Sequence, residues 1–121
     1  MDWITVLYSA NATLLLIHEI ESAYEREWEI LKLPGGITGF LLMHIPIILL
    51  MFYGLIEVHR GSTTGMILGL VFGVSGLLPL LVHRFVVPWP ERFNRPFSRI
   101  LFLLNALAGI ALFACSMPGL I

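Results

Sequence analysis

Four apolar stretches, each about long enough to cross a lipid bilayer, constrain this chain more than any other feature of its sequence. They run from about Trp3 to Tyr24, Ile37 to Val58, Thr63 to Val87 and Phe97 to Pro118. A helix needs about 20 mostly apolar residues to span the hydrocarbon core. The predicted fold is therefore all-α, an integral membrane antiparallel four-helix bundle that forms a single domain over residues 1–121.

The composition supports lipid, rather than water, as the solvent of this chain. Hydrophobic residues make up 58% and charged residues 12% of the 121 positions. Soluble domains average about 45–50% apolar and about 25% charged residues. The formal net charge of −1 gives no support for binding to a polyanion, so we expect membrane lipid and no nucleic acid as a partner.

Basic residues are distributed unevenly among the short connections. Six of them flank the first and third loops, namely Arg26, Lys32, Arg84, Arg92, Arg95 and Arg99, whereas the second loop holds Arg60 alone. Loops rich in Lys and Arg stay in the cytoplasm. The first and third loops are therefore predicted to be cytoplasmic, with both termini on the non-cytoplasmic side.

The first apolar stretch contains ionisable residues, which are costly inside a membrane and usually functional. Asn11, His18, Glu21 and Glu25 fall at helical spacing and form one stripe, which we expect to face the bundle interior. Glu19 points elsewhere, toward a second groove or toward the membrane interface.

Polar groups on the other helices are predicted at the same depth. At about 1.5 Å of rise per residue, His18, His44 and Asn105 lie about two turns from the cytoplasmic ends of their helices. His83 lies about one turn from the cytoplasmic end of the third helix. All four helices thus contribute a polar side chain at one level of the cytoplasmic half.

Several uses of this polar cluster remain open. Three imidazoles with a carboxylate suit a transition metal such as Zn or Fe, and the candidate ligands are His18, Glu21, His44 and His83. Without metal, Glu21 and His18 are candidate catalytic groups for acid–base work on a lipid-soluble substrate, supported by Glu25 and Asn105. The cluster could also bind the polar head of a lipid-soluble small molecule. Alternatively, it is a structural network in a non-enzymatic accessory or assembly protein.

Two further expectations concern packing and the membrane surface. Gly65, Gly69 and Gly73 form a GxxxGxxxG stripe, which packs against a helix either within the protomer or in a homo-oligomer. Glu57 and His59 lie beside the second loop and are expected to be solvated. A charged extension of the first helix is expected over residues 25–32 at the cytoplasmic surface.

Three short motifs give the chain a family resemblance. They are His18-Glu19-Ile20-Glu21, Glu27-Trp28 and His44-Ile45-Pro46. This pattern resembles the uncharacterised HXXEE-type small bacterial membrane proteins, a domain of unknown function, with Ser22 in place of the second glutamate. The resemblance implies a four-helix protein of the bacterial inner membrane. It implies no reaction, but it marks His18, Glu21 and His44 as residues to test.

Overall fold

The structure is a computed structural model that describes residues 2–85 and 95–120. These residues form α1 (Trp3–Tyr24), α2 (Glu27–Ile30), α3 (Gly36–Arg60), α4 (Thr63–Phe85), α5 (Pro96–Ser116) and the 3-10 turn η1 (Met117–Leu120). Within the described residues, α1, α3, α4 and α5 are each long and apolar enough to cross a membrane. The predicted all-α fold with four spanning helices is confirmed. The last two residues of the third predicted stretch, Val86 and Val87, and Arg92 lie outside the described residues.

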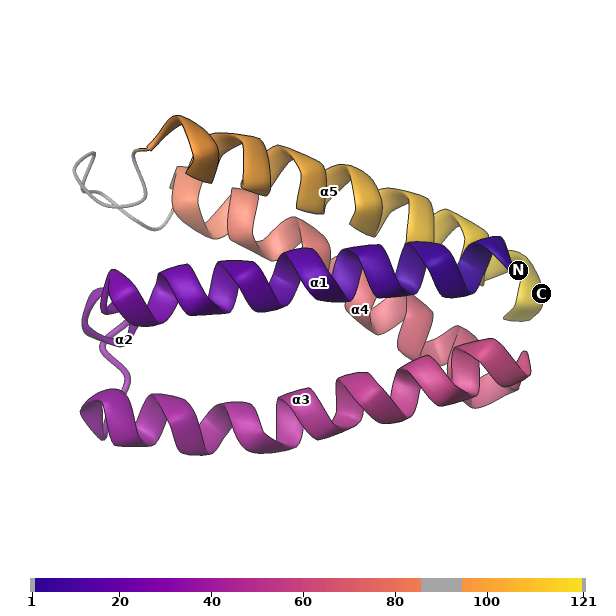
Figure 1. Cartoon of the computed structure of the whole chain (residues 1–121), viewed down its shortest axis with the longest axis horizontal. Coiled ribbons are helices and arrows are strands. Elements are labelled where there is room, and N and C mark those ends of the chain that lie inside the picture. Colours follow the sequence, from indigo (N-terminus) through magenta and orange to yellow (C-terminus); the bar gives the residue numbers. More distant parts are fainter. Residues whose placement is uncertain (1, 86–94, 121) are drawn as a thin grey trace.

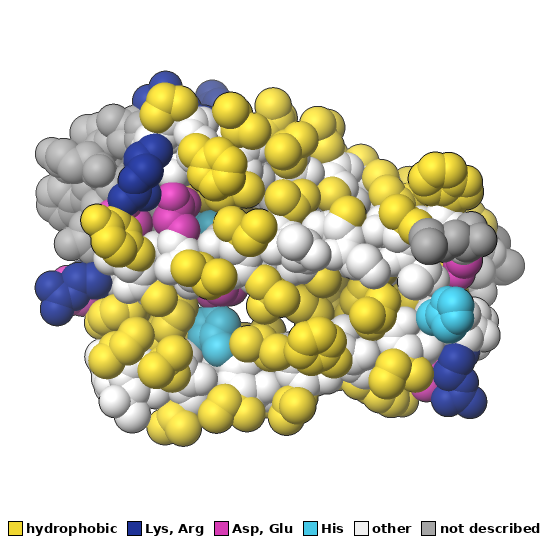
Figure 2. Space-filling view, in the orientation of Figure 1, with side chains coloured by type: hydrophobic (Ala, Val, Ile, Leu, Met, Phe, Trp, Pro, Cys, Tyr) yellow, Lys and Arg dark blue, Asp and Glu magenta, His cyan; other side chains and the backbone are white. Residues whose placement is uncertain are grey.

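The four long helices form an antiparallel bundle in which α1 and α4 each contact the other three. In Figure 1, α5 and α3 lie on opposite sides of α1, and α4 contacts α1, α3 and α5. The first and last described residues lie at the same end of the bundle. Figure 2 shows hydrophobic side chains over the middle of the visible face, with Lys and Arg side chains toward its two ends. This distribution suits a protein whose middle contacts lipid.

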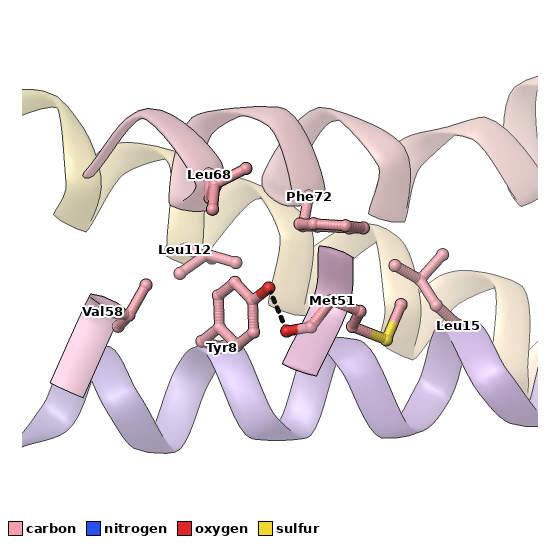
Figure 3. Close-up of a cluster of buried hydrophobic side chains, with 7 residues drawn as sticks. All are labelled: Tyr8, Leu15, Met51, Val58, Leu68, Phe72 and Leu112. Atoms are coloured by element: carbon pink, nitrogen blue, oxygen red, sulfur yellow. Dashed lines mark hydrogen bonds between the residues drawn. The ribbon is translucent and has the colours of Figure 1, made fainter. Parts of the chain in front are cut away.

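The hydrophobic core lies where α1, α3 and α4 meet, and it extends to α5. Its buried members, drawn in Figure 3, are Tyr8, Leu15, Met51, Val58, Leu68, Phe72 and Leu112. The hydroxyl of Tyr8 donates a hydrogen bond of 2.7 Å to the carbonyl of Met51. The ring of Tyr8 meets Phe72 edge to face, with centroids 5.8 Å apart. Tyr8 therefore ties α1 to both α3 and α4.

The glycine stripe of α4 packs inside the protomer. A Cβ atom added to Gly73 would lie 2.9 Å from both the carbonyl oxygen of Gly109 and the amide nitrogen of Phe113 on α5. Gly69 faces Ser116, and Gly65 faces the backbone at Glu57. Glycine is thus needed for the close approach of α4 and α5. The homo-oligomer stays a prediction, but these glycines are already covered by their own chain.

The connection after α1 differs from the predicted charged helical extension. Arg26 takes a left-handed conformation with φ of 57°, so α1 ends at Tyr24 and the chain turns. α2 then adds a single turn before Gly35, at φ of 92°, starts α3. The expected continuous extension is therefore wrong. The helix does not continue because the chain reverses at Arg26, and this reversal folds Glu27 and Trp28 back against the bundle.

The connection after α3 corrects a second expectation. Glu57 is buried, with 8% of its surface exposed, rather than solvated. Its carboxylate accepts a hydrogen bond of 2.6 Å from the Ser62 hydroxyl and one of 3.1 Å from Arg60. The Ser62 hydroxyl in turn accepts from the amide of Gly65 at 3.0 Å. Glu57 therefore organises the turn that joins α3 to α4.

Candidate functional site

A carboxylate–imidazole pair joins α1 to α3. Oε2 of Glu19 lies 2.5 Å from Nε2 of His44, and Nδ1 of His44 lies 2.7 Å from the carbonyl oxygen of Phe40. A carbonyl can only accept, so Nδ1 carries a proton and donates it to Phe40. The second ring nitrogen and the Glu19 carboxylate then share the remaining proton. This arrangement holds either a charged pair or a neutral acid with a neutral imidazole, and it can move a proton between the two.

The Glu19–His44 pair stands in the wall of a cavity of about 310 Å³, here called the lateral cavity. Four ionisable side chains line it: His18, Glu19, Glu27 and His44. Its other walls are mainly apolar and include Leu15, Trp28, Leu31, Phe40, Met43, Ile47, Phe72, Leu78, Pro79 and Val82. Figure 2 shows a hollow beside a histidine side chain, between the helices that Figure 1 identifies as α1 and α3.

Aromatic rings form the end of the lateral cavity nearest α2. The ring centroids of Trp28 and Phe40 lie 5.4 Å apart, and those of Phe40 and His44 lie 4.2 Å apart. Trp28 is buried because the chain reverses at Arg26 and presses α2 against the start of α3. The turn after α1 therefore builds part of the cavity.

Glu27 and His18 face each other at the inner side of the lateral cavity. Oε2 of Glu27 lies 4.0 Å from Nε2 of His18, and the same nitrogen lies 3.3 Å from the hydroxyl of Ser22. Burial raises the pKa of Glu27, while a hydrogen bond from Ser22 and the charge of His44 oppose this rise. Glu27 is therefore a carboxyl that holds a proton more readily than a solvated glutamate.

A second polar cluster lies between α1 and α5. Oε2 of Glu21 accepts a hydrogen bond from Ser98 and one of 3.1 Å from Arg95. Arg95 also contacts Glu25 at 2.9 Å and lies over the ring of Tyr24, 5.0 Å from its centroid. These contacts hold the C-terminal end of α1 against the start of α5.

His83 and Asn105 belong to the interior between α1, α4 and α5. The ring of Phe102 meets both His18 and His83, with centroids 5.5 and 4.7 Å away. Asn105 is only 1% exposed, and neither atom of its amide group has a hydrogen-bond partner among the described residues. Asn11, fully buried, donates to the carbonyl of Phe72 at 2.7 Å. The predicted inward stripe of α1 thus runs along a buried polar interior.

The structure divides the predicted site residues between two places. His18 and His83 meet around Phe102, with Glu21 held nearby by α5, whereas His44 pairs with Glu19 across the lateral cavity. Over residues 2–85 and 95–120, no group of three or more His, Cys, Asp or Glu side chains could hold a metal ion. The transition-metal site therefore stays a prediction.

Two residues of the lateral cavity were not among the predicted site residues. Glu19 lies off the polar stripe, but its depth in α1 and that of His44 in α3 could have suggested an imidazole–carboxylate pair. Glu27 was placed on a surface extension, and no signal in the sequence predicts the reversal at Arg26 that brings it inward.

The fold and these clusters define a small helical membrane protein with a polar interior and a lateral cavity. Comparison with family models matches residues 4–118 to a family of unknown function, DUF6713. The chain belongs to this family, which confirms the resemblance to an uncharacterised domain of unknown function. No curated protein and no solved structure matches the chain.

Proposed function

We propose that this protein binds a lipid-soluble small molecule in the lateral cavity, with Glu19 and His44 as the polar anchor. The observation that carries the proposal is the cavity itself, which combines about 310 Å³ of space with apolar walls and a few polar groups. Pockets for small molecules typically measure about 300–1,000 Å³ and have this mixed lining. The volume suits a head group and the first part of an apolar tail.

Access from the bilayer supports the same proposal. Met43 and Ile47 line the cavity, yet 42% and 40% of their surfaces are exposed on the lipid-facing side of α3. A ligand could therefore enter between α1 and α3, while its tail stays in the surrounding lipid. Polar groups inside a membrane usually have a function. Glu19 and His44 are such groups, and they lie beside this opening between α1 and α3.

The Glu19–His44 pair also suits acid–base chemistry on the bound molecule. Glu19 and His44 share a proton at 2.5 Å, and a pair that shares a proton can act as acid and base on a bound molecule. The predicted catalytic candidates His18 and Glu21 are less well placed for this role. His18 borders the cavity, but Glu21 is engaged by Ser98 and Arg95. Catalysis would then depend on Glu19 and His44.

We further propose that the cavity opens in the cytoplasmic half of a bacterial inner membrane, with both termini outside the cytoplasm. The support is the excess of basic residues near the α2 end, including Arg26, Lys32 and Arg95. A reporter fused to either terminus tests the orientation, because alkaline phosphatase is active only outside the cytoplasm.

A second function is favoured by the contacts between α1 and α5. Glu21 joins Ser98 and Arg95, and Arg95 also holds Glu25. Such a network suits the alternative that the His/Glu cluster is structural and that the protein is a non-enzymatic accessory or assembly factor.

A Zn or Fe centre at His18, Glu21, His44 and His83 is a further proposal, to be tested by elemental analysis of purified protein.

A pair of matched tryptophan variants tests ligand binding. Ile47→Trp fills the lateral cavity, whereas Leu50→Trp adds the same ring to α3 at a residue of similar exposure, 44% against 40%, outside the lining. Lipid-soluble molecules that copurify with each protein are extracted and identified by mass spectrometry. The proposal expects a defined compound with the wild type and with Leu50→Trp, and its loss with Ile47→Trp. Equal recovery from all three proteins would contradict it.

A further inference from the structure

Two carboxyl groups, but no Lys or Arg of the described residues, line the lateral cavity. Glu19 and Glu27 line it together with His18 and His44, and none of its lining residues within the described chain is Lys or Arg. A ligand with a carboxylate or phosphate head would meet two carboxyl groups and no guanidinium or ammonium. Burying an anionic head group without a cationic partner is costly. The lining therefore disfavours acidic lipids.

The two carboxyl groups are not equally neutralised. Glu19 has His44 at 2.5 Å, whereas the imidazole of His18 lies 4.0 Å from Glu27. No Lys or Arg of the described residues forms an ion pair with Glu27. The side chain of Glu27 is only 12% exposed, so water supplies little compensation. Burial accordingly raises the pKa of Glu27. A ligand with a cationic group next to the Glu27 carboxylate would supply the positive charge that no Lys or Arg of the described residues provides there.

The remaining walls offer groups that favour a cation. Trp28, Phe40 and Phe72 present aromatic rings to the cavity, and Trp is the strongest cation–π partner among the side chains. Pro79 has no N–H, so the carbonyl of Ser75 loses its usual helical donor. Ser75 and Pro79 both line the cavity. An ammonium group could donate to that carbonyl as well as to the carboxylates.

We infer that the ligand of the lateral cavity is a lipophilic amine, whose ammonium head lies between Glu27 and Glu19 and against Trp28, and whose tail leaves between α1 and α3. This inference rests on the proposed function and specifies its ligand class. Charge-assisted hydrogen bonds are about twice as strong as neutral ones. An amine should therefore bind about tenfold more tightly than an alcohol with the same tail.

Three probes that share one tail separate the head-group chemistry from general affinity for lipid. Dodecylamine, dodecanol and dodecanoate are titrated against the wild type in lipid nanodiscs at neutral pH, and binding is measured by competition with a fluorescent dodecyl probe. The inference expects the order amine, alcohol, carboxylate. Equal binding of amine and alcohol, or strongest binding of dodecanoate, would overturn it while leaving the proposed function intact. Failure of all three to bind would count against both.

A matched pair of variants assigns the effect to Glu27. Glu27→Gln keeps the size of the side chain and removes its charge, so it should weaken amine binding about tenfold and leave alcohol binding unchanged. Glu29→Gln makes the same change two residues along α2, where Glu29 pairs with Arg26 outside the cavity. It should alter neither affinity. Equal loss of amine binding in the two variants would overturn the assignment, and the wild-type titrations still decide the ligand class if a variant fails to fold.

Discussion

The imidazole of His44 bridges two helices, with Nδ1 at 2.7 Å from the Phe40 carbonyl on its own helix and Nε2 at 2.5 Å from the Glu19 carboxylate on α1. The Phe40 contact fixes the tautomer and the ring orientation, and the Glu19 contact joins α3 to α1 beside the lateral cavity. The two residues therefore connect the stability of the bundle to the lateral cavity.

A double-mutant cycle should detect coupling between Glu19 and His44. We expect Glu19→Gln and His44→Gln each to lower the free energy of unfolding. The free energy of unfolding of the double variant should fall by about 1 kcal/mol less than the sum of the two single losses. The coupling is this small because the side chain of Glu19 is 32% exposed, so the pair is partly screened. Denaturation in detergent, followed by circular dichroism, measures the cycle. Strict additivity would show that the pair contributes no coupling energy.

The close packing of α4 against α5 should depend on Gly73. Gly73→Leu forces a side chain against the backbone of Gly109 and Phe113, which a Cβ atom would already approach to 2.9 Å. The overpacking costs about 1–3 kcal/mol, which outweighs the gain of about 1 kcal/mol from replacing a helical glycine. We therefore expect a lower melting temperature, whereas Val74→Leu, at a residue 46% exposed, should change it little. A fall in melting temperature whose size depends on protein concentration would instead favour a homo-oligomer packed through the Gly65/Gly69/Gly73 stripe.

The joint between α1 and α5 should depend on Ser98. Its hydroxyl is fully buried and donates to Glu21, so Ser98→Ala leaves that carboxylate with Arg95 alone. Loss of a buried hydrogen bond to a charged group costs about 1.5–3 kcal/mol. Thr13→Val, which removes an exposed hydroxyl bonded to its own helix, is the control and should cost much less. Equal losses of unfolding free energy in the two variants would contradict this role for Ser98.

The stability of the fold should depend on pH through Glu27. Burial raises the pKa of this carboxyl in the folded protein above its ordinary value of about 4.3. Between the ordinary and the raised pKa, the folded state binds more protons than the unfolded state, so the free energy of unfolding falls as pH rises through this window. Glu27→Gln should remove that component, whereas Glu29→Gln should retain it. Denaturation curves at several pH values measure the slope, and an identical slope in wild type and Glu27→Gln would rule out the contribution.

The sequence predicted the spanning helices well because membrane insertion depends on length and apolar content, which can be read directly. It also predicted a buried polar face on α1, since Asn11 and His18 are indeed enclosed. The grouping of side chains on different helices was harder to predict. Helical spacing does not fix how each helix is rotated against its neighbours, so Glu19, rather than Glu21, meets His44. The reversal at Arg26 was equally unpredictable, because it needs a left-handed conformation that Arg rarely adopts.

Binding of a lipid-soluble molecule in the lateral cavity is tested by photo-crosslinking of the wild type with a dodecyl amine that carries a diazirine near its head. Peptide mass spectrometry then locates the label. We expect labelling at Phe40, Met43 and Ile47 on α3 and at Trp28, with suppression by excess dodecylamine and in the Ile47→Trp variant. Unsaturable labelling spread over lipid-exposed residues such as Leu103 and Leu107 on α5 would mean that the probe only dissolves in the surrounding lipid, and it would contradict binding in the lateral cavity.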